Sequence, residues 1–493
     1  MWGNKKFEEK TMKLKNSVLF RQQCYIGGQW VDADGGETSK VTNPANGEVI
    51  GTIPKMGAAE TDRAIAAAGD AFAGWRGRTA KNRANILRKW FELIVANADD
   101  LAIILTSEQG KPLAEAKGEV LYGAAFIEWF AEEGRRAYGD IIPAHMTNKR
   151  ILVLKQPVGV VASITPWNFP SAMLTRKAGP ALAAGCPFVA KPAHETPYSA
   201  LALAVLAEQA GLPPGLFNVI TGPASVIGKA MTDSPVVRKI TFTGSTEVGK
   251  ILMRQCAGSI KKVGLELGGN APFIVFEDAD IDAAVEGAIM CKYRNSGQTC
   301  VCANRIYFHD QVYDAFLGKF VAAVAKIKVG NGMEADTTQG PLINDQAVEK
   351  VEQHIADAVQ KGGKVVAGGK RHRLGGKFFE PTVISEASDE MLCAREETFG
   401  PMAPVFRFKS EEEVIARANA TDFGLAAYFY ARDVGRIFRV SEALESGIIG
   451  VNTGIISTEV APFGGVKQSG IGREGSKYGL EEFLEIKYVC LGI

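Results

Sequence analysis

The sequence predicts an α/β fold with a parallel, doubly wound sheet and a second α/β region after it. Three observations support this prediction. From VVASITP at residues 160–166 onward, short β-branched apolar runs alternate with helical patterns, which is typical of a parallel sheet covered by helices. A second alternation of strands and helices runs from about residue 271 to residue 451. The chain of 493 residues is long enough for about two or three domains with large cores.

Before this alternation, the chain begins with predicted strands and helices. The segments YIGGQWVDA and SKVTNPANGEVIGTIP read as strands separated by a Gly-Gly turn. Apolar residues at three- and four-residue spacing then predict helices from about Ala58 to Arg135, and Gly110 is the expected C-terminal stop of one of them. The next segment, RILVLKQPVGVVASITPW, first alternates and then becomes a continuous apolar run that fits a buried strand.

Strand–helix units follow one another in the first alternating region. The predicted strands are VVASITP, PFVAKP, FNVITG and KITFTG, and the predicted helices are SAMLTRKAGPALAAG, YSALALAVLAEQAG, a short helix around residues 227–231, and TEVGKILMRQCA. In the second region APFIVF, RIYFH, GKFFEPTVI and APVFRF read as strands and DAFLGKFVAAVAKI reads as a helix. Another helix there is predicted to contain the segment with Cys300 and Cys302.

Composition and charge exclude several classes of protein. Hydrophobic residues make up 46% and charged residues 23% of the chain, and the formal net charge is +1, so no overall field points to nucleic acid or an anionic membrane as partner. No apolar run reaches the about 18 residues that would span a bilayer. The opening MWGNKKFEEKTMKLK is polar and lacks the apolar centre of a secretory signal, and Met12 could be the natural start. We therefore expect a cytoplasmic protein.

The cysteines point to chemistry and not to a scaffold. Eight cysteines are too sparse for a disulfide framework, they form no C-x-x-C pair, and the histidines do not gather with them, so no metal site is predicted. Two of them lie in NSGQTCVC, flanked by Arg294 and Arg305, and positive charge favours the reactive thiolate. Cys300 is a candidate nucleophile. Cys302 is either a small buried hydrophobe or a redox partner that forms a disulfide with Cys300.

Polar residues lie where several predicted strands end. KITFTGSTEVG ends a strand and begins a helix, so backbone amides and hydroxyls near Gly244 and Ser245 form a phosphate-binding geometry. A simple helix cap by Ser245 is the alternative. Lys191 ends the strand in PFVAKP, on the side of the sheet where open α/β folds bind ligands.

Glu266 and Asn168 are candidates for acid–base and oxyanion roles. Apolar neighbours would raise the carboxyl pKa of Glu266 and suit a general base near neutral pH, whereas a structural carboxylate that caps backbone amides is the alternative. Asn168 lies between two prolines in TPWNFP and could donate to a developing oxyanion, unless the turn needs it only for its conformation. Combined with Cys300, Lys191 and Ser245, these residues favour oxidation through a covalent thioester.

Six motifs resemble the serial signatures of the aldehyde dehydrogenase superfamily. They are TPWNFP, FTGSTEVG, ELGGNAP, NSGQTC, EETFGP and PFGGVKQSGIGREGS, and they occur in the family's order, within a resemblance that covers about residues 23–489. The resemblance implies a doubly wound nucleotide-binding domain, an interleaved α/β catalytic domain and a β arm that mediates homo-oligomers, either dimers or tetramers. The implied bounds are 1–137 with 157–267 for the first domain, 268–470 for the second, and 138–156 with 471–493 for the arm.

The resemblance also implies a role for each motif residue. Cys300 would be the nucleophile, and Glu266 would activate the deacylating water. Asn168 and the backbone amide of Cys300 would hold the oxyanion. The implied cofactor cleft comprises Thr165, Trp167, Lys191, Gly244, Ser245, Leu267, Glu397 and Phe399, with Lys191 and Glu397 at the riboses and Ser245 at the pyrophosphate. In this mechanism the thiolate attacks an aldehyde, hydride passes to the nicotinamide, and water releases the acid.

The segments TRKAGPALAAGCP, KYRNSGQTCVCANR and NTGIISTEVAPFGG resemble succinate-semialdehyde dehydrogenases in particular. This likeness implies that Arg176, Arg294 and Ser457 bind a carboxylate, and an arginine fork suits bidentate recognition of that group. For Arg176 alone, a surface position on a helix is the alternative. Glutarate semialdehyde stays a rival substrate, because one methylene is worth only about 1–3 kcal/mol in a pocket. A nucleotide-independent esterase or thioesterase is the rival of a different class.

The cofactor preference depends on the residue three positions after Lys191. Family members that prefer NAD usually carry a glutamate there, which accepts hydrogen bonds from the ribose hydroxyls and repels a 2′-phosphate. Here it is His194, which cannot repel that phosphate, so NADP is predicted. Glu195 is adjacent and keeps NAD open. The expected partners are a small semialdehyde and further copies of this chain.

Overall fold

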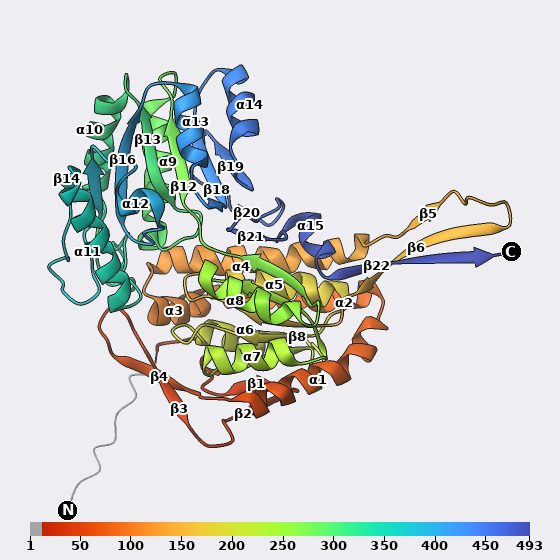
Figure 1. The fold of residues 1–493 in the computed structure, drawn as a ribbon. Coiled ribbons are helices and arrows are strands. Elements are labelled where there is room, and N and C mark those ends of the chain that lie inside the picture. Colours follow the sequence, from red (N-terminus) through yellow and green to blue (C-terminus); the bar gives the residue numbers. More distant parts are fainter. Residues whose placement is uncertain (1–11) are drawn as a thin grey trace, which may run out of the picture.

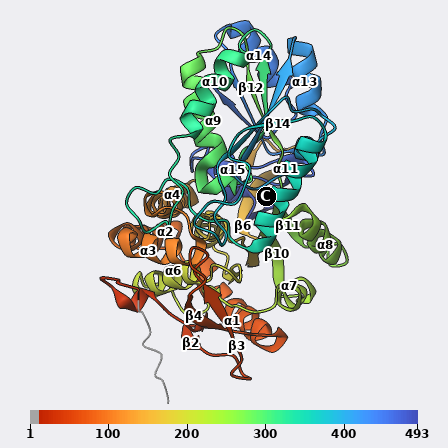
Figure 2. The ribbon, with the colours of Figure 1, turned by 90° about the vertical axis from the view of Figure 1, so that its left-hand side faces the viewer.

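The computed structural model describes residues 12–493, so the polar opening segment, except for its last few residues, lies outside the described part. The described chain forms two α/β units, each built on its own large sheet, and a β arm that projects from the body (Figure 1). A quarter turn shows the second unit standing above the first (Figure 2). The predicted α/β class is confirmed, because both sheets are parallel at their centres and both carry helices.

The first sheet has eight strands in the order β2-β1-β9-β8-β7-β10-β11-β21. They are β1 (Cys24–Ile26), β2 (Gln29–Val31), β7 (Val160–Ile164), β8 (Phe188–Lys191), β9 (Phe217–Val219), β10 (Val237–Thr243), β11 (Lys262–Glu266) and β21 (Gly470–Ile471). The five central strands, β9, β8, β7, β10 and β11, run parallel to one another. Strands β1, β2 and β21, at the two edges of the sheet, pair antiparallel. The chain therefore winds in both directions from β7, which lies between β8 and β10.

Helices cover both faces of the first sheet. Side chains alternate along each strand, so Val161 and Phe188 face one helical layer while Val160 and Val189 face the other. The first layer contains α2 (Ala80–Ala96), α3 (Ala98–Gln109), α4 (Leu113–Glu133), α5 (Ala172–Ala184) and α6 (Tyr198–Gln209), and the second contains α1 (Ala58–Arg76), α7 (Ala224–Asp233) and α8 (Thr246–Ala257). Gly110 ends α3 in the left-handed conformation at φ 96°, which confirms the predicted stop.

The second sheet has seven strands in the order β14-β15-β16-β13-β12-β18-β19. They are β12 (Ala271–Val275), β13 (Ala303–His309), β14 (Lys364–Ala367), β15 (Thr382–Ser385), β16 (Met402–Phe408), β18 (Ala426–Tyr430) and β19 (Ile448–Val451). All neighbours pair in parallel except β14 with β15. Its helices are α9 (Ile281–Tyr293) and α10 (Tyr313–Val324) on one face, α13 (Glu411–Asn419) and α14 (Val434–Ala443) on the other, and α11 (Asp345–Gln360) with α12 (Leu392–Arg395) beside β15 and β16.

The arm is a three-stranded antiparallel sheet in the order β22-β6-β5. Its strands are β5 (Asp140–Ile142), β6 (Lys149–Pro157) and β22 (Leu484–Gly492), and β22 pairs with β6 along its whole length. The remaining short elements are β3 (Thr38–Thr42), β4 (Val49–Pro54), β17 (Phe423–Gly424), β20 (Val466–Lys467), α15 (Ser476–Glu481), and the 3-10 turns Ser17–Leu19, Gly134–Arg136 and Arg294–Gly297. The domain bounds drawn from the sequence stay a prediction.

The two units meet where the carboxyl ends of the first sheet face the amino ends of the second. Asn168, after β7, donates from its Nδ2 to the carbonyl of Gln298, before β13, at 3.1 Å. The rings of Trp167 and Phe399 meet edge to face with their centroids 5.6 Å apart. Within residues 12–493, no helix is both long and apolar enough to cross a membrane, and no group of three or more His, Cys, Asp or Glu residues could hold a metal ion.

Candidate active site

Cys300 lies in a turn between α9 and β13 and not within a helix. The predicted helix through the cysteine segment is therefore wrong, since α9 ends at Tyr293. Asn295, Ser296 and Gly297 follow with φ values of 52°, 58° and 74°, and this left-handed region cannot continue a right-handed helix. The spacing of apolar residues does not reveal this break, because contacts with distant segments impose it.

Buried polar groups hold this strained turn against the first unit. Asn295 Oδ1 accepts from Gln109 Nε2 at 2.9 Å, and Asn295 Nδ2 donates to the Asn168 carbonyl at 3.0 Å. The Asn295 backbone N–H donates to Glu115 at 2.9 Å. A non-glycine residue at positive φ persists only where its surroundings over-determine it. These contacts therefore fix the position of Cys300.

Asn168 lies beside the Cys300 turn with one donor to spare. The side-chain amide nitrogen of Asn168 carries two hydrogens. Among the described residues, one hydrogen bond is formed from it, to the Gln298 carbonyl. The Asn168 carbonyl accepts from Lys111 Nζ at 2.7 Å, which secures the turn. The side chain is 3% exposed. The second Nδ2 hydrogen can therefore serve an oxyanion formed at Cys300, which is the role predicted for this residue.

A cavity of about 280 Å³ opens in front of Cys300. All three residues predicted to bind a carboxylate line it, namely Arg176, Arg294 and Ser457. Sequence patterns missed most of its other lining residues, which are Lys111, Glu115, Glu119, Tyr122, Phe169, Met173 and Phe463. A larger hollow of about 1170 Å³ lies at the root of the arm, and none of the predicted site residues line it. We therefore place the candidate active site at the smaller cavity.

Arg176 belongs to a buried charge cluster. It is 2% exposed, so the alternative of a surface arginine is wrong. Its Nε forms an ion pair with Glu474, and its guanidinium lies over the Phe463 ring at 4.2 Å. Lys177 also pairs with Glu474 and donates to Thr243 Oγ1 at 2.6 Å. Glu474 comes from a segment almost 300 residues away in sequence; it lies in the motif PFGGVKQSGIGREGS, which gave no role to this residue.

Arg294 is the cation of the cavity without an acidic partner. Its guanidinium lies over the Phe169 ring at 5.4 Å, and it makes no ion pair or side-chain hydrogen bond with any residue that the structure describes. The other cations of the lining, Lys111 and Arg176, each pair with a glutamate. A part-buried guanidinium that lacks an acid is suited to bind the anionic group of a ligand.

Burial dominates the ionisation of Cys300 and raises the pKa of its thiol to about 12. Arg176 and Arg294 lower the pKa but do not overcome this effect. The expectation that Arg305 favours the thiolate is wrong, because its guanidinium donates to backbone carbonyls of the second unit, among them that of Asn270 at 2.9 Å. As a nucleophile, Cys300 would therefore start as a thiol and need a base.

Glu266 ends β11 as a buried carboxylate, 3% exposed. Its Oε2 has no hydrogen-bond partner, and none of the described residues shows the amide-capping bonds of the alternative reading. Burial first, and the neighbouring Glu474 second, raise its pKa well above the usual carboxyl value. A Cβ at Gly464 would lie 2.9 Å from Glu266 Oε1, so the chain passes very close to this carboxylate. Such a group suits a general base.

Cys302 faces away from the cavity. Its Sγ lies 3.3 Å from the Lys292 carbonyl and the residue is 7% exposed, as expected for a small buried residue. Thr299, Cys300 and Val301 line the cavity, but Cys302 does not. A disulfide between the two cysteines would require this turn to rebuild, and the redox role stays a prediction.

The residues predicted to hold a cofactor gather at the carboxyl ends of the strands in the first sheet, which we call the cofactor edge. Thr165 and Trp167 follow β7, Lys191 ends β8, Gly244 and Ser245 follow β10, and Leu267 follows β11. Open α/β sheets bind ligands at the carboxyl ends of their strands, next to the point where the winding reverses. Glu397 and Phe399 reach this edge from the second unit, and the Gly269 N–H donates to Glu397 Oε1 at 3.2 Å.

Polar atoms at this edge fit a dinucleotide. Lys191 Nζ is buried, which lowers its pKa, and it donates to the Pro192 carbonyl at 3.1 Å. Thr165 Oγ1 is buried and has no hydrogen-bond partner among residues 12–493. Ser245 caps α8 by accepting from the Val248 N–H at 3.3 Å, so the helix-cap reading is correct for its side chain. The earlier N–H groups of α8 remain open to a phosphate.

Comparisons with known proteins agree with this geometry. The aldehyde dehydrogenase family matches residues 30–489. A glutarate-semialdehyde dehydrogenase of Pseudomonas aeruginosa is 67% identical over 98% of this chain and 100% of its own length. The NADP(+) succinate-semialdehyde dehydrogenase of Escherichia coli K12 is 64% identical over 98% of this chain and 100% of its own. The crystal structure of a succinate-semialdehyde dehydrogenase from Burkholderia pseudomallei superposes with a TM-score of 0.97 at 63% identity, covering 98% of this chain and 100% of that one.

Proposed function

The chain belongs to the aldehyde dehydrogenase family, and we propose that this enzyme oxidises succinate semialdehyde to succinate with NADP. The observation that carries the proposal is the single cavity that joins the Cys300 thiol to the Arg294 guanidinium, which has no acidic partner. A short aldehyde with a terminal carboxylate has the two groups that this pair requires, a carbonyl for the thiol and an anion for the cation.

The lining residues fall into two groups, one suited to bind the substrate and one suited to react with it. Arg294, with Arg176 and Ser457, holds the substrate carboxylate and directs the aldehyde carbon to Cys300. The Cys300 sulfur attacks that carbon, and the resulting oxyanion accepts hydrogen bonds from Asn168 Nδ2 and the Cys300 backbone N–H. The nicotinamide nucleotide, when bound, supplies the hydride acceptor. Loss of hydride from the tetrahedral carbon leaves a thioester on Cys300.

Glu266 provides the base. The thiol proton must leave before attack, because burial keeps the Cys300 pKa high, and a water must lose a proton before it can hydrolyse the thioester. Glu266 is buried, and burial together with the neighbouring Glu474 raises its pKa well above the usual carboxyl value, so it is a stronger base than an exposed carboxylate. Addition of water to the aldehyde carbon and loss of the sulfur give the carboxylic acid and regenerate the thiol.

The same edge supports NADP as cofactor. Lys191 and Glu397 would hold the riboses and the amino end of α8 the pyrophosphate, in a cleft closed by Trp167 and Phe399. His194 is exposed near Lys191 and carries no negative charge that would repel a 2′-phosphate. The E. coli relative is named for NADP(+), which supports this choice. NAD remains the alternative, because Glu195 is adjacent to His194.

Glutarate semialdehyde is the second candidate substrate. The relative from P. aeruginosa, which is 67% identical, is named for it. One more methylene changes binding by about 1–3 kcal/mol, so a cavity of about 280 Å³ can accept both compounds with different efficiency. Nothing in the comparisons supports the nucleotide-independent esterase as the main activity.

Steady-state kinetics test the proposal. We expect kcat/KM for succinate and glutarate semialdehyde with NADP to exceed that for butanal by about tenfold or more, since butanal lacks the carboxylate. Betaine aldehyde, which is cationic, is the control for charge and should be a poor substrate. Equal efficiency for all four compounds would contradict carboxylate recognition. Absence of nucleotide reduction with every aldehyde would refute the proposed oxidation.

A further inference from the structure

The loop between α12 and β16 carries backbone strain that the proposed chemistry alone does not explain. Phe399 lies in the left-handed region at φ 55°, which is a true outlier for a bulky aromatic residue. Gly400 follows, and a Cβ there would come within 2.3 Å of Val351 on α11. The loop is therefore pressed against α11 in a conformation that its own residues do not favour. Such strain persists when other groups hold it in place.

Thr398 is the point at which the loop is held. Glu397 and Phe399 flank it and reach the first unit, where Glu397 accepts from the Gly269 N–H at 3.2 Å and Phe399 meets Trp167. Thr398 is 1% exposed, and its contacts are with the second unit. The position of Thr398 thus determines where its two neighbours reach into the cofactor edge.

Asn304 holds the backbone of Thr398. Asn304 lies at the start of β13, four residues after Cys300, and its Oδ1 accepts from the Thr398 N–H at 3.1 Å. Its Nδ2 donates to the Glu396 carbonyl at 2.9 Å and to Asn270 Oδ1 at 2.6 Å. The strand that follows the nucleophile and the loop that reaches the cofactor edge are therefore joined by one buried amide.

His354 holds the side chain of Thr398. It lies on α11, is 1% exposed, and its Nδ1 is hydrogen-bonded to Thr398 Oγ1 at 3.1 Å. Its Nε2 lies 3.5 Å from a carboxylate oxygen of Glu396. Both ring nitrogens of His354 thus contact this loop. Neither Asn304 nor His354 lines the cavity in front of Cys300.

We propose that Asn304 and His354 are positioning residues for the nicotinamide half of the cofactor, acting through Thr398 on Glu397 and Phe399. The hydride acceptor must lie next to Cys300, and Glu397 accepts from Gly269, where a Cβ would come within 2.4 Å of the Cys300 carbonyl oxygen. The inference rests on the proposed NADP-dependent function. It assigns a task to two buried residues that touch neither the substrate cavity nor the first unit. Buried hydrogen bonds of this kind specify one conformation, because an unpaired polar atom in their place is costly.

Thr398→Val is the sharpest variant, because it keeps the backbone bond to Asn304 and the shape of the side chain but removes the hydroxyl that His354 holds. Thr106→Val is the matched control, since Thr106 Oγ1 is equally buried but has no partner. Asn304→Ala and His354→Gln complete the set. Asn304→Ala alone would be ambiguous if it failed to fold, and Thr398→Val avoids this problem.

Three measurements separate positioning from general damage. Calorimetric titration of the aldehyde-free enzyme with NADP should show about tenfold weaker binding for Thr398→Val and His354→Gln, the effect of one buried hydrogen bond. Binding of adenosine 2′,5′-bisphosphate, which lacks the nicotinamide half, should be unchanged. Hydrolysis of p-nitrophenyl acetate without nucleotide, which reports Cys300 and Glu266, should also be unchanged.

The outcomes distinguish this inference from the proposed function. If the parent binds NADP and Thr398→Val binds it equally well, the positioning role is overturned and the proposed function stands. Equal losses for NADP and the bisphosphate, or a parallel loss of ester hydrolysis, would show general damage and would also overturn it. A parent enzyme that binds neither NADP nor NAD would refute both.

Discussion

At Cys300, burial and then the carboxylates of Glu397 and Glu266 raise the pKa of the thiol, whereas Arg176 and Arg294 lower it, and the result is a pKa of about 12. Only the thiolate reacts with iodoacetamide, and its fraction rises tenfold per pH unit below the pKa. We therefore expect alkylation of Cys300 in the cofactor-free enzyme to rise about tenfold per unit between about pH 6 and pH 9. Mass spectrometry of the Cys300 peptide measures this, with the exposed Cys490 as internal reference. A rate that is already constant above pH 7 would mean that Arg176 and Arg294 outweigh burial.

Substitution of the two arginines of the cavity should affect the kinetics in different ways. Arg294 has no acidic partner, so Arg294→Ala removes only the cation that a substrate carboxylate would meet, and we expect KM for succinate semialdehyde to rise about tenfold or more while kinetics with butanal barely change. Arg176→Ala also leaves Glu474 without one of its two cations, close to Glu266. That variant should therefore slow the oxidation of every aldehyde.

Steady-state assays of each variant with succinate semialdehyde and with butanal measure these changes in KM and in the rate of oxidation. An Arg294→Ala enzyme that loses activity equally toward succinate semialdehyde and butanal would show that Arg294 supports the turn around Cys300 and does not recognise the carboxylate.

Sequence alone predicted candidate residues whose chemistry is visible in a short motif, and the structure brings them together. Cys300, Glu266 and Asn168 each lie in a segment of small or rigid residues where a reactive side chain is conspicuous. Glu474 lies in the motif PFGGVKQSGIGREGS but received no role, because its importance comes from ion pairs with Arg176 and Lys177, almost 300 residues away. The effect of Arg305 was misjudged for the same reason. Its distance from Cys300 in sequence is short, but its guanidinium is turned to the opposite side of β13.

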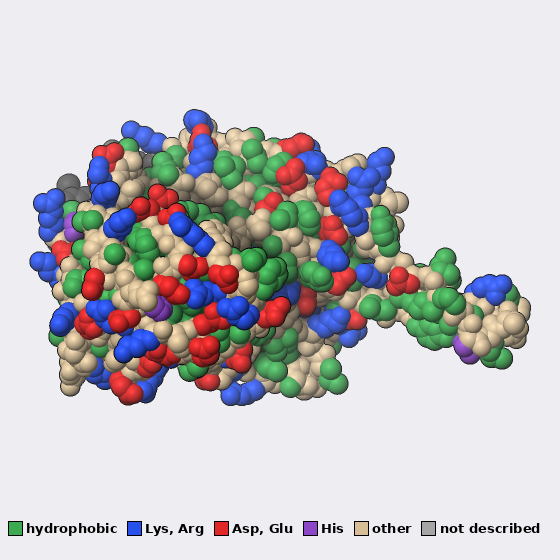
Figure 3. Space-filling model, turned by 90° about the horizontal axis from the view of Figure 1, so that it is seen from above, with side chains coloured by type: hydrophobic (Ala, Val, Ile, Leu, Met, Phe, Trp, Pro, Cys, Tyr) green, Lys and Arg blue, Asp and Glu red, His purple; other side chains and the backbone are tan. Residues whose placement is uncertain are grey.

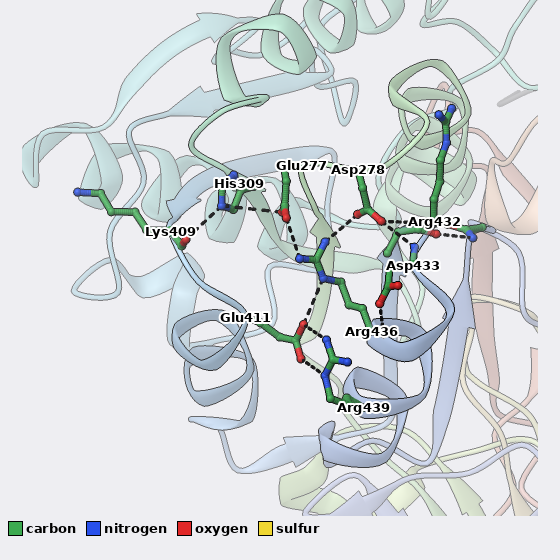
Figure 4. A network of polar contacts seen from close by, with 11 residues as sticks. Glu277, Asp278, His309, Lys409, Glu411, Arg432, Asp433, Arg436 and Arg439 are labelled. Atoms are coloured by element: carbon green, nitrogen blue, oxygen red, sulfur yellow. Dashed lines mark hydrogen bonds and ion pairs between the residues drawn. The ribbon is translucent and has the colours of Figure 1, made fainter.

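At the scale of elements, the two ends of the strands in the second sheet carry different groups of residues. Cys300 lies at the amino ends of these strands, whereas a network of ion pairs lies at their carboxyl ends (Figure 4). Arg436, at the start of α14, donates to Glu277 at 2.7 Å, to Asp278 at 2.8 Å and to Glu411 at 3.2 Å. The network ties α13 and α14 to the end of β12 and fills the place where a parallel sheet would otherwise open a crevice.

Arg436→Ala should weaken this unit without affecting catalysis. The side chain is 18% exposed and also lies over the Phe276 ring at 4.6 Å, so we expect a loss of about 2 kcal/mol in the free energy of unfolding, seen as a lower urea midpoint. Arg432→Ala is the control, because Arg432 belongs to the same network but its side chain is 69% exposed and, in the described part of the chain, forms an ion pair with Asp280 alone. It should cost less than about 0.5 kcal/mol. Equal midpoints for the two variants would contradict this account.

Periodicity predicted the strand–helix units well because each unit carries its own pattern of apolar residues, as in β8 with α6 and β10 with α8. It failed at the Cys300 turn, where Asn295 and Ser296 adopt positive φ under the influence of Gln109 and Glu115. It also gave no sign that β21 completes the first sheet. Pairing between β11 and β21 joins segments about 200 residues apart, and such pairing leaves no local signature.

At the scale of the molecule, the candidate active site lies where the carboxyl ends of strands in one sheet face the amino ends of strands in the other. Asn168 and Glu266 come from carboxyl ends of strands in the first sheet, and Cys300 precedes a strand of the second. No single unit contains the nucleophile, the base and the oxyanion donor together. Each unit alone would therefore lack the proposed chemistry, and the contacts between Asn168 and the Cys300 turn are the link between fold and function.

The arm is the other feature that belongs to the whole molecule, and it predicts self-association. Its outer strands, β5 and β22, each have one unpaired edge, and apolar side chains gather on the arm (Figure 3). On one face of the arm Ile486 is 74%, Tyr488 60% and Ile142 44% exposed, because Cys490 and Ile142 both pair with Ile151 of β6 and so share the face of the other even-numbered residues of β22. Soluble chains rarely leave such an apolar surface uncovered, so we expect a second copy to cover it in a dimer or tetramer. Ile486→Glu should shift the mass measured by light scattering toward the monomer. Lys487→Gln, its neighbour on the opposite face of β22, should leave the mass unchanged. A parent enzyme that is monomeric at micromolar concentration, or an Ile486→Glu enzyme with the parent's mass, would contradict this role for the arm.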